Sequence, residues 1–313
     1  MDILLFSFNG VAPICVMVLL GIVLRRTNTV TQSTAKAMNK LCFQLFIPCK
    51  IFSQIYQSDL TNVTNLRTIV FALMSTATCL LLLCIIVPKF IPLSPACGEF
   101  IQGTYRSNSA MLGMQLMTDL YGEAACTALA LPLPLMIIFY NFTAPLILTR
   151  YTGGKKVSAK DTFCRVMTNP FLLAALLGLV SALLQMKFPL FIRNTISSLG
   201  AVGSSLGLIA LGAVTEISSF RKSGRLALLS SILRLVMFPL IILPIGIALG
   251  IRGAQLTVLL CFFCTPTAVG GYVLAQNIDG DGELAGQILL QTTMLSFLTL
   301  FVTIALLRGL AVL

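Results

Sequence analysis

The chain has 313 residues, of which 57% are hydrophobic and only 10% are charged, and its formal net charge is +11. An ordinary soluble domain carries about 25% charged residues, so this composition excludes a soluble globular protein. Apolar runs of roughly 20 residues, the length needed to cross a bilayer as a helix, follow one another along most of the chain. The sequence therefore predicts an all-α polytopic membrane protein.

Ten membrane-spanning helices are predicted in chain order, separated by charges, Gly, Pro and polar clusters. Their approximate ranges are 3–24, 35–57, 67–90, 99–120, 124–149, 167–186, 195–217, 226–251, 254–277 and 284–308. The fourth and ninth spans are the least regular, because polar residues interrupt both of them and Gly or Pro accompanies the interruption. These two interruptions are the first indication of a functional site.

Most of the basic residues lie in connections on one side of the predicted membrane. Lys and Arg concentrate on the cytoplasmic side of membrane proteins, so this side is assigned to the cytoplasm. Both termini are then predicted to be extracytoplasmic, with the chain in the plasma membrane. Topology explains the positive charge, and no nucleic-acid partner is predicted.

The longest polar connection, residues 150–166, is predicted to be a cytoplasmic loop. It separates an N-terminal repeat (1–149) from a C-terminal repeat (167–313), and each repeat contains five spans. Because five is an odd number, the second repeat would enter the membrane the opposite way up. Inverted repeats with interrupted helices in corresponding positions are typical of secondary transporters.

The fourth span contains the candidate site residues Asn108 and Gly113. A helix break there would place the Asn108 amide and free backbone N–H groups where a carboxylate could dock. The alternative interpretation is that Asn108 hydrogen-bonds to a neighbouring helix while Gly113 permits close packing.

The ninth span is interrupted at Pro266, which has no backbone N–H and frees the carbonyl one turn earlier. Thr265 and Thr267 flank this proline, and the Gly270–Gly271 pair that follows holds a helix poorly. We predict a helix break with ligand-binding groups here. A proline kink without any ligand role is the alternative, since membrane helices tolerate proline.

Other polar side chains at membrane depth are predicted to face the protein interior. They are Asn39, Asn141, Gln291 and Thr292, and an interhelical hydrogen bond is an equally good interpretation of each. Arg234 lies roughly 13 Å of helix deeper than Arg225, so its partner is predicted to be a counter-charge, a carbonyl cluster or an anionic solute. Lys50 and Arg106 are predicted to lie nearer span ends and to reach the interface.

The chemistry that the sequence lacks is also informative. It contains no His, and Glu99 and Glu216 are predicted to lie near span ends, so no mid-membrane proton relay is predicted. The Cys261–Cys264 C-x-x-C pattern lies in an apolar run and is interpreted as packing. No nucleotide-binding or hydrolase motif occurs, so neither an enzyme activity nor a cofactor nor a metal site is predicted.

Several segments resemble those of one known family. The second span is similar to the pattern N-x-L-x-F-x-x-x-x-P-x-x-x-F, the seventh contains Gly207–Gly212 (GLIALG), and the ninth contains Pro266–Ala275 (PTAVGGYVLA). Arg234 with Pro239 in the eighth span and Gln291 to Thr293 in the tenth extend the likeness. Together these segments resemble the auxin efflux carrier family, which includes plant auxin carriers and bacterial permeases for malate, malonate and similar carboxylates.

The resemblance implies a fold of two inverted five-helix repeats. Spans 1, 2, 6 and 7 would form a scaffold that dimerises, and spans 3–5 and 8–10 would form a transport domain. Spans four and nine would cross as broken helices, with the substrate carboxylate at the crossing. One departure is that the family usually has Pro after the glycine of the fourth span, where this chain has Met114, so the predicted break depends on Asn108 and Gly113.

The predicted function is therefore secondary transport of small organic anions, mono- or dicarboxylates, by alternating access. Its predicted partners are the anion, the lipid bilayer and a second copy of the chain in a homodimer. Two alternatives are a membrane ligand sensor or receptor on the same fold, and a cation-coupled transporter of a neutral or sterol-like solute.

Overall fold

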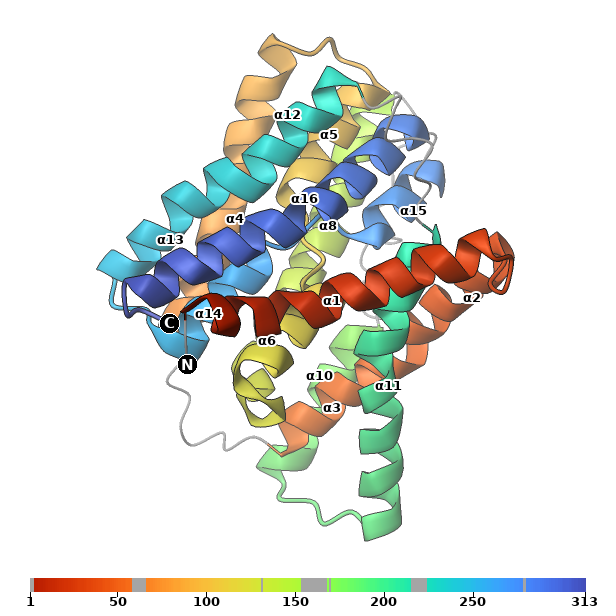
Figure 1. Cartoon of the computed structure of the whole chain (residues 1–313), viewed down its shortest axis with the longest axis vertical. Coiled ribbons are helices and arrows are strands. Elements are labelled where there is room, and N and C mark those ends of the chain that lie inside the picture. Colours follow the sequence, from red (N-terminus) through yellow and green to blue (C-terminus); the bar gives the residue numbers. More distant parts are fainter. Residues whose placement is uncertain are drawn as a thin grey trace.

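The computed structural model describes residues 3–57, 66–130, 132–152, 168, 170–214, 224–277 and 280–313. Helices make up almost all of these residues (Figure 1), which confirms the all-α prediction. The predicted central loop at 150–166 and Glu216 fall largely or wholly outside the described residues.

The first half of the chain folds into long helices joined by short π-helical and 3-10 turns. They are, in chain order, α1 (Ile3–Arg26), α2 (Gln32–Leu41), the π-helical turn η1 (Cys42–Phe46), α3 (Ile47–Tyr56), α4 (Leu66–Ile86), the 3-10 turn η3 (Val87–Lys89), α5 (Pro95–Tyr105), the π-helical turn η4 (Ser109–Gly113), α6 (Met114–Tyr121), the 3-10 turn η5 (Glu123–Cys126), α7 (Thr127–Ala130) and α8 (Pro132–Thr152). The turn η1 joins α2 to α3 without a break, so the second predicted span is one continuous rod.

The second half follows the same plan of long rods and interrupted helices. Its elements are α10 (Pro170–Leu183), α11 (Leu190–Val214), α12 (Arg225–Ile232), the π-helical turn η7 (Leu233–Met237), α13 (Phe238–Ala248), α14 (Gly253–Phe263), α15 (Val269–Asn277) and α16 (Gly282–Gly309). Within the described residues, six helices are long and apolar enough to cross a membrane. The chain is thus a multi-pass membrane protein.

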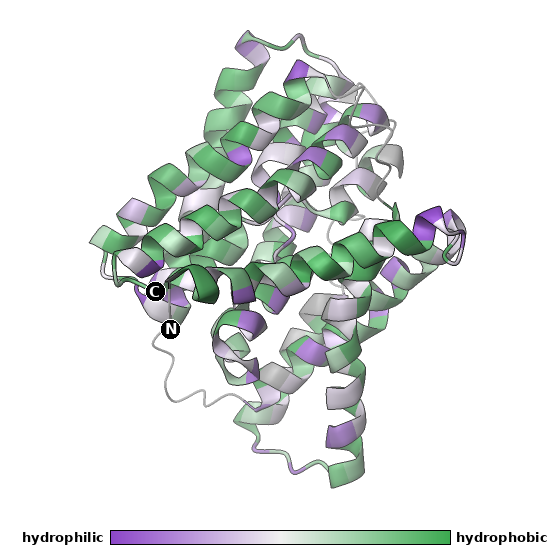
Figure 2. Ribbon diagram, in the orientation of Figure 1, coloured by the Kyte–Doolittle hydropathy of each residue, from purple (hydrophilic) through white to green (hydrophobic). Residues whose placement is uncertain are grey.

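Large apolar side chains cover the outward faces of these helices. On α4, for example, Leu66 is 64% exposed, Met74 62% and Leu81 63%. Figure 2 shows the same apolar character along α1, α4 and α16. Such surfaces are stable against lipid, where backbone groups must be paired inside the helix.

The helices α1 and α11 approach each other closely through two glycines. A Cβ atom on Gly21 would lie 2.0 Å from the Ile209 carbonyl oxygen, and one on Gly212 would lie 2.0 Å from the Val18 carbonyl oxygen. Small residues of this kind let membrane helices approach until their backbones touch. The contact leaves no room for any side chain at either glycine.

We predict that Gly212→Ala destabilises the protein by about 1–3 kcal/mol, because the added methyl group would force α1 and α11 apart. The thermal unfolding midpoint of the purified protein measures this effect. The matched control is Gly286→Ala, also within a helix, where a Cβ would make an ordinary contact at 3.5 Å from the Tyr272 ring. An unchanged midpoint in the Gly212 variant would contradict the packing argument.

Candidate functional site: two helix breaks around a basic cavity

Two helices break in the middle of the structure. The helix α5 ends at Tyr105, and Arg106 adopts an extended conformation with φ −82° and ψ 126°. Helical structure resumes in the π-helical turn that begins at Ser109. On the other side, α14 ends at Phe263 and α15 begins only at Val269.

The two breaks are joined through their backbones. Ser107 and Thr267 form an isolated antiparallel β-bridge, and the Asn108 N–H donates to the Pro266 carbonyl at 2.9 Å. Backbone groups released by a break in a membrane helix must be paired within the protein. Each break therefore supplies part of the hydrogen bonding that the other has lost.

Gly113 lies beyond the break, inside the π-helical turn. A Cβ atom there would be 2.8 Å from the Cys261 Cβ, and the Cys261 thiol donates to the Gly113 carbonyl at 3.2 Å. These contacts pack Gly113 closely against α14, as in the alternative interpretation of this glycine. The break itself falls at Arg106–Asn108 and needs no proline at Met114.

Arg234 is fully buried and holds both breaks together. Its Nη1 donates to the Tyr105 carbonyl at 2.9 Å, its Nη2 to the Phe262 carbonyl at 2.7 Å and its Nε to the Thr265 carbonyl at 3.0 Å. These carbonyls are at the C-terminal ends of α5 and α14, where the helix dipoles place negative partial charge. Of the three partners that the sequence allowed, the structure has the carbonyl cluster.

A cavity of about 660 Å³ lies beside the breaks. Its polar and charged lining side chains come from α2, η1, the first break, α8 and α15. They are Lys36, Asn39, Lys40, Gln44, Arg106, Ser107, Asn108, Ser109, Tyr140, Asn141 and Tyr272. The structure thus brings three of the predicted residues, Asn39, Asn108 and Asn141, into one cavity.

The charge of this cavity is positive. Arg106, Lys36 and Lys40 line it, and no acidic side chain is among its described lining residues. Arg106 Nη2 donates to the Asn141 Oδ1 at 3.3 Å. Its Nη1 and the Asn108 Nδ2 are buried N–H donors without a hydrogen-bond partner among the described residues.

The placement of Arg106 corrects the expectation that it reaches the membrane interface. It lies at the break, and its side chain borders the cavity and packs against Gly270, whose Cβ position is 3.2 Å from Arg106 Nη2. The signal in the sequence was its position two residues before Asn108, inside the interrupted span. The Lys50 side chain is only 5% exposed, and its ammonium group is ion-paired to Glu123.

The other predicted site residues lie outside the cavity lining. The Thr265 hydroxyl donates to the Cys261 carbonyl at 2.7 Å. The Thr267 N–H donates to the Thr292 hydroxyl at 3.2 Å, and Gln291 accepts from the Ser231 hydroxyl at 3.4 Å. The Thr265 bond stays within the last turn of α14. The Thr267 bond ties the second break to α16, and the Gln291 bond joins α16 to α12. The last two are interhelical hydrogen bonds, the alternative that the sequence left open for Gln291 and Thr292.

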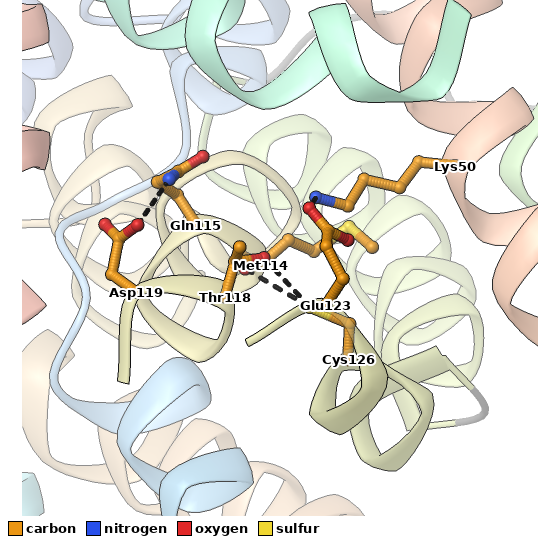
Figure 3. Close-up of polar contacts among 7 residues, drawn as sticks. All are labelled: Lys50, Met114, Gln115, Thr118, Asp119, Glu123 and Cys126. Carbon is orange, nitrogen blue, oxygen red and sulfur yellow. Dashed lines mark hydrogen bonds and ion pairs between the residues drawn. The ribbon is translucent and has the colours of Figure 1, made fainter. Parts of the chain in front are cut away.

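A second group of polar residues lies at the far end of the α2–α3 rod (Figure 3). Lys50 on α3 and Glu123 in η5 form an ion pair with an N–O distance of 3.5 Å. Gln115 donates to Asp119 at 2.7 Å on the neighbouring α6. The ion pair borders a separate cavity of about 500 Å³. From Lys36 to Lys50 is roughly 20 Å of helix, so the two cavities are near opposite ends of this rod.

Six apolar helices of membrane-spanning length, two helices broken at the same level and a cavity beside the breaks define a membrane transporter. The family model described as "Membrane transport protein" matches residues 6–162 and 155–304. The chain belongs to this family, which confirms the resemblance drawn from its sequence.

Relatives of the chain come from bacteria and archaea. The "Uncharacterized transporter YfdV" of Escherichia coli K12 is 24% identical over 307 residues, covering 91% of this chain and 94% of that protein. An "Uncharacterized transporter" of Methanothermobacter thermautotrophicus is 27% identical over 297 residues, covering 94% and 96%. The "Putative malonate transporter" of Rhizobium meliloti is 25% identical over 289 residues, covering 87% of each.

A solved structure shares the fold. The sodium proton antiporter MjNhaP1 from Methanocaldococcus jannaschii superposes with a TM-score of 0.61 over 93% of this chain and 92% of that chain, at 14% sequence identity. At this identity the likeness concerns the fold alone.

We predict that Arg234→Lys unfolds or strongly destabilises the protein, by about 3–5 kcal/mol, because one ammonium group cannot reach three carbonyls that face a planar guanidinium. Thermal unfolding of the purified variant measures the loss. Arg225→Lys on the same helical run is the matched control, since Arg225 is exposed. Equal stability of the two variants would contradict the role assigned to Arg234.

Proposed function

We propose that the chain is a secondary transporter of small organic anions, mono- or dicarboxylates, and that it works by alternating access. The observation that carries this proposal is the pair of unpartnered buried donors, Arg106 Nη1 and Asn108 Nδ2, in a cavity with basic and no acidic lining side chains among the described residues. A carboxylate has two oxygens that accept such hydrogen bonds, and charge-assisted bonds to Arg are among the strongest.

A dicarboxylate suits the cavity particularly well. One carboxylate would bind Arg106 and Asn108 at the break, and the second would lie toward Lys36 and Lys40 at the mouth. The name of the Rhizobium meliloti relative mentions malonate, the dicarboxylate with a single carbon between its carboxyl groups. Malonate is therefore the first substrate to test.

The packing of the helices supports the proposed inverted repeats, 1–149 and 167–313, with five spans each. The helix α1 packs on α11, and α10 packs on α3. Likewise α5 packs on α12, and α14 packs on α4. If the second half repeats the first, the two contacts in each of these pairs correspond to one another. We propose that α1, α2–α3, α10 and α11 form a scaffold that dimerises, and that the remaining helices move as a transport domain.

The two cavities support alternating access. Lys36 and Lys40 lie next to the α1–α2 connection, which the distribution of basic residues assigns to the cytoplasm. The large cavity would then be open to the cytoplasm, with both termini extracytoplasmic. On the opposite side the Lys50–Glu123 ion pair joins the scaffold helix α3 to η5, and this contact would have to break for the site to open outward.

We predict that Arg106→Gln and Asn108→Ala each lower the uptake of labelled malonate into proteoliposomes at least tenfold, because each removes a donor to the carboxylate. Lys187→Gln, an exposed residue outside the cavity, is the matched control. The two site variants should elute as folded protein at the wild-type position in size-exclusion chromatography. Uptake equal to wild type in both would place the site elsewhere.

The same assay separates the proposal from its alternatives. Binding of malonate without any flux in the wild-type protein would favour a sensor. Flux of a neutral solute in place of any carboxylate would favour the cation-coupled alternative.

For the outer contact, we predict that Glu123→Gln makes the second cavity more accessible from outside, because the neutral amide no longer holds Lys50. A cysteine introduced by Ser53→Cys, which lines this cavity, should react several-fold faster with a membrane-impermeant thiol reagent in the Glu123→Gln background. Asp119→Asn, which leaves the ion pair intact, is the control. Equal rates in the two backgrounds would argue against an outer gate at this position.

A further inference from the structure

A buried carboxyl group lies on α5 outside the cavity. Glu99 lies near the start of α5, as the sequence suggested, and is only 1% exposed. Its Oε1 accepts from the Gln102 Nε2 at 2.9 Å, and its Oε2 has no partner among the described residues. Among the described residues no cation forms an ion pair with Glu99. The ion pair found among them is Lys50–Glu123.

Glu99 belongs to a polar stripe that leads to the cavity. Glu99 and Gln102 are three residues apart on one face of α5. Arg106 follows four residues after Gln102, immediately past the end of this helix. Gln102 is also 1% exposed, and its Oε1 has no described partner. The stripe faces the two glycines of α15: a Cβ on Gly271 would lie 2.7 Å from the Gln102 Nε2.

The charged neighbours of Glu99 are few. Arg106, immediately past the end of α5, and Asp281, the N-cap of α16, act on it electrostatically. The other helices packed against α5 also carry ionisable groups, none of which is ion-paired to Glu99 within the described residues. They are Arg67, Cys79, Cys84, Lys89, Tyr140, Arg150, Tyr151, Arg225, Arg234, Tyr272, Glu283 and Arg308.

An isolated ionised carboxylate is strongly disfavoured in such surroundings, so the group is suited to exchanging a proton. Sodium is the other candidate ion, but hard cations need about six oxygen ligands. The stripe offers only two unpartnered oxygens, on Glu99 and Gln102, among the described residues. The described residues also contain no cluster of three or more His, Cys, Asp or Glu side chains that could hold a metal ion.

We propose that Glu99 is the proton-binding site of this transporter, and that one proton bound there is carried together with the anion at Arg106. This inference rests on the proposed function. Protonation removes a negative charge from the stripe, so Arg106 is left to attract the substrate anion. By linkage, anion binding strengthens proton binding by the same factor.

The size of the coupling follows from the geometry. Glu99 and Arg106 are separated by two helical turns, roughly 10 Å along the axis. A unit charge at that distance changes anion affinity by on the order of tenfold at the effective dielectric near a protein surface. A tenfold effect is sufficient to make the carrier that holds both the proton and the anion the favoured loaded form.

The first test detects the proton directly, using infrared difference spectroscopy of the purified full-length protein between neutral and alkaline pH. A C=O band of a protonated carboxylic acid is expected at neutral pH, absent in Glu99→Gln and retained in Asp119→Asn. Asp119 is a matched control because a glutamine hydrogen-bonds to it in the same way, at 2.7 Å from Gln115. If Glu99→Gln removes no band, the proposal is overturned, whether or not malonate is transported.

The second test measures coupling in proteoliposomes, with protein-free liposomes correcting for leakage of malonic acid. An outside-acid pH gradient should drive accumulation of labelled malonate by wild type. In Glu99→Gln the ratio of gradient-driven accumulation to exchange of labelled for unlabelled malonate should fall at least tenfold. Accumulation that follows a Na⁺ gradient and ignores the pH gradient overturns the proton site but leaves anion transport standing.

If wild-type protein moves no malonate at all, the proposed substrate is wrong. The infrared band then decides the proton site alone: a band that depends on Glu99 supports it, and its absence overturns it.

Discussion

The crossing of the two broken helices depends on one buried guanidinium group. Arg234 donates to backbone carbonyls at the C-terminal ends of both α5 and α14. Without this positive charge, the negative ends of two helix dipoles would lie together uncompensated. In a bilayer no water is available to satisfy these carbonyls. The short backbone contact between Asn108 and Pro266 adds a second link, so the broken segments form a defined structure instead of two frayed helix ends.

The two buried arginines near the crossing have different roles because their hydrogen bonding differs. Arg234 donates to four backbone carbonyls, so each of its three nitrogens has a partner within the protein. Arg106 has one described partner, Asn141, and one terminal nitrogen without any among the described residues. The same residue type therefore serves as a fixed structural cation at one position and as a candidate anion-binding group at the other.

The helix contacts around the site are of two kinds, close backbone packing and polar side-chain contacts. The helices α1 and α11 touch backbone to backbone at Gly21 and Gly212, a contact that leaves little freedom for relative movement. Around the cavities, by contrast, the contacts are polar and the side chains are long, as with Lys50 and Glu123. This contrast supports the proposal of a rigid scaffold and a second body that moves against it.

The sequence by itself determined that the chain is all-α and that two of its helices are interrupted. Continuous apolar runs cannot fold otherwise in lipid, and the clusters at Asn108 and Pro266 cannot continue a helix easily, so local composition was sufficient. Tertiary structure decided which polar groups face the cavity. Depth along a helix is readable from spacing, but the neighbours of a side chain depend on how the half-helices tilt and pack. For that reason Arg234 was found among carbonyls, Arg106 in the cavity and Glu99 in the interior.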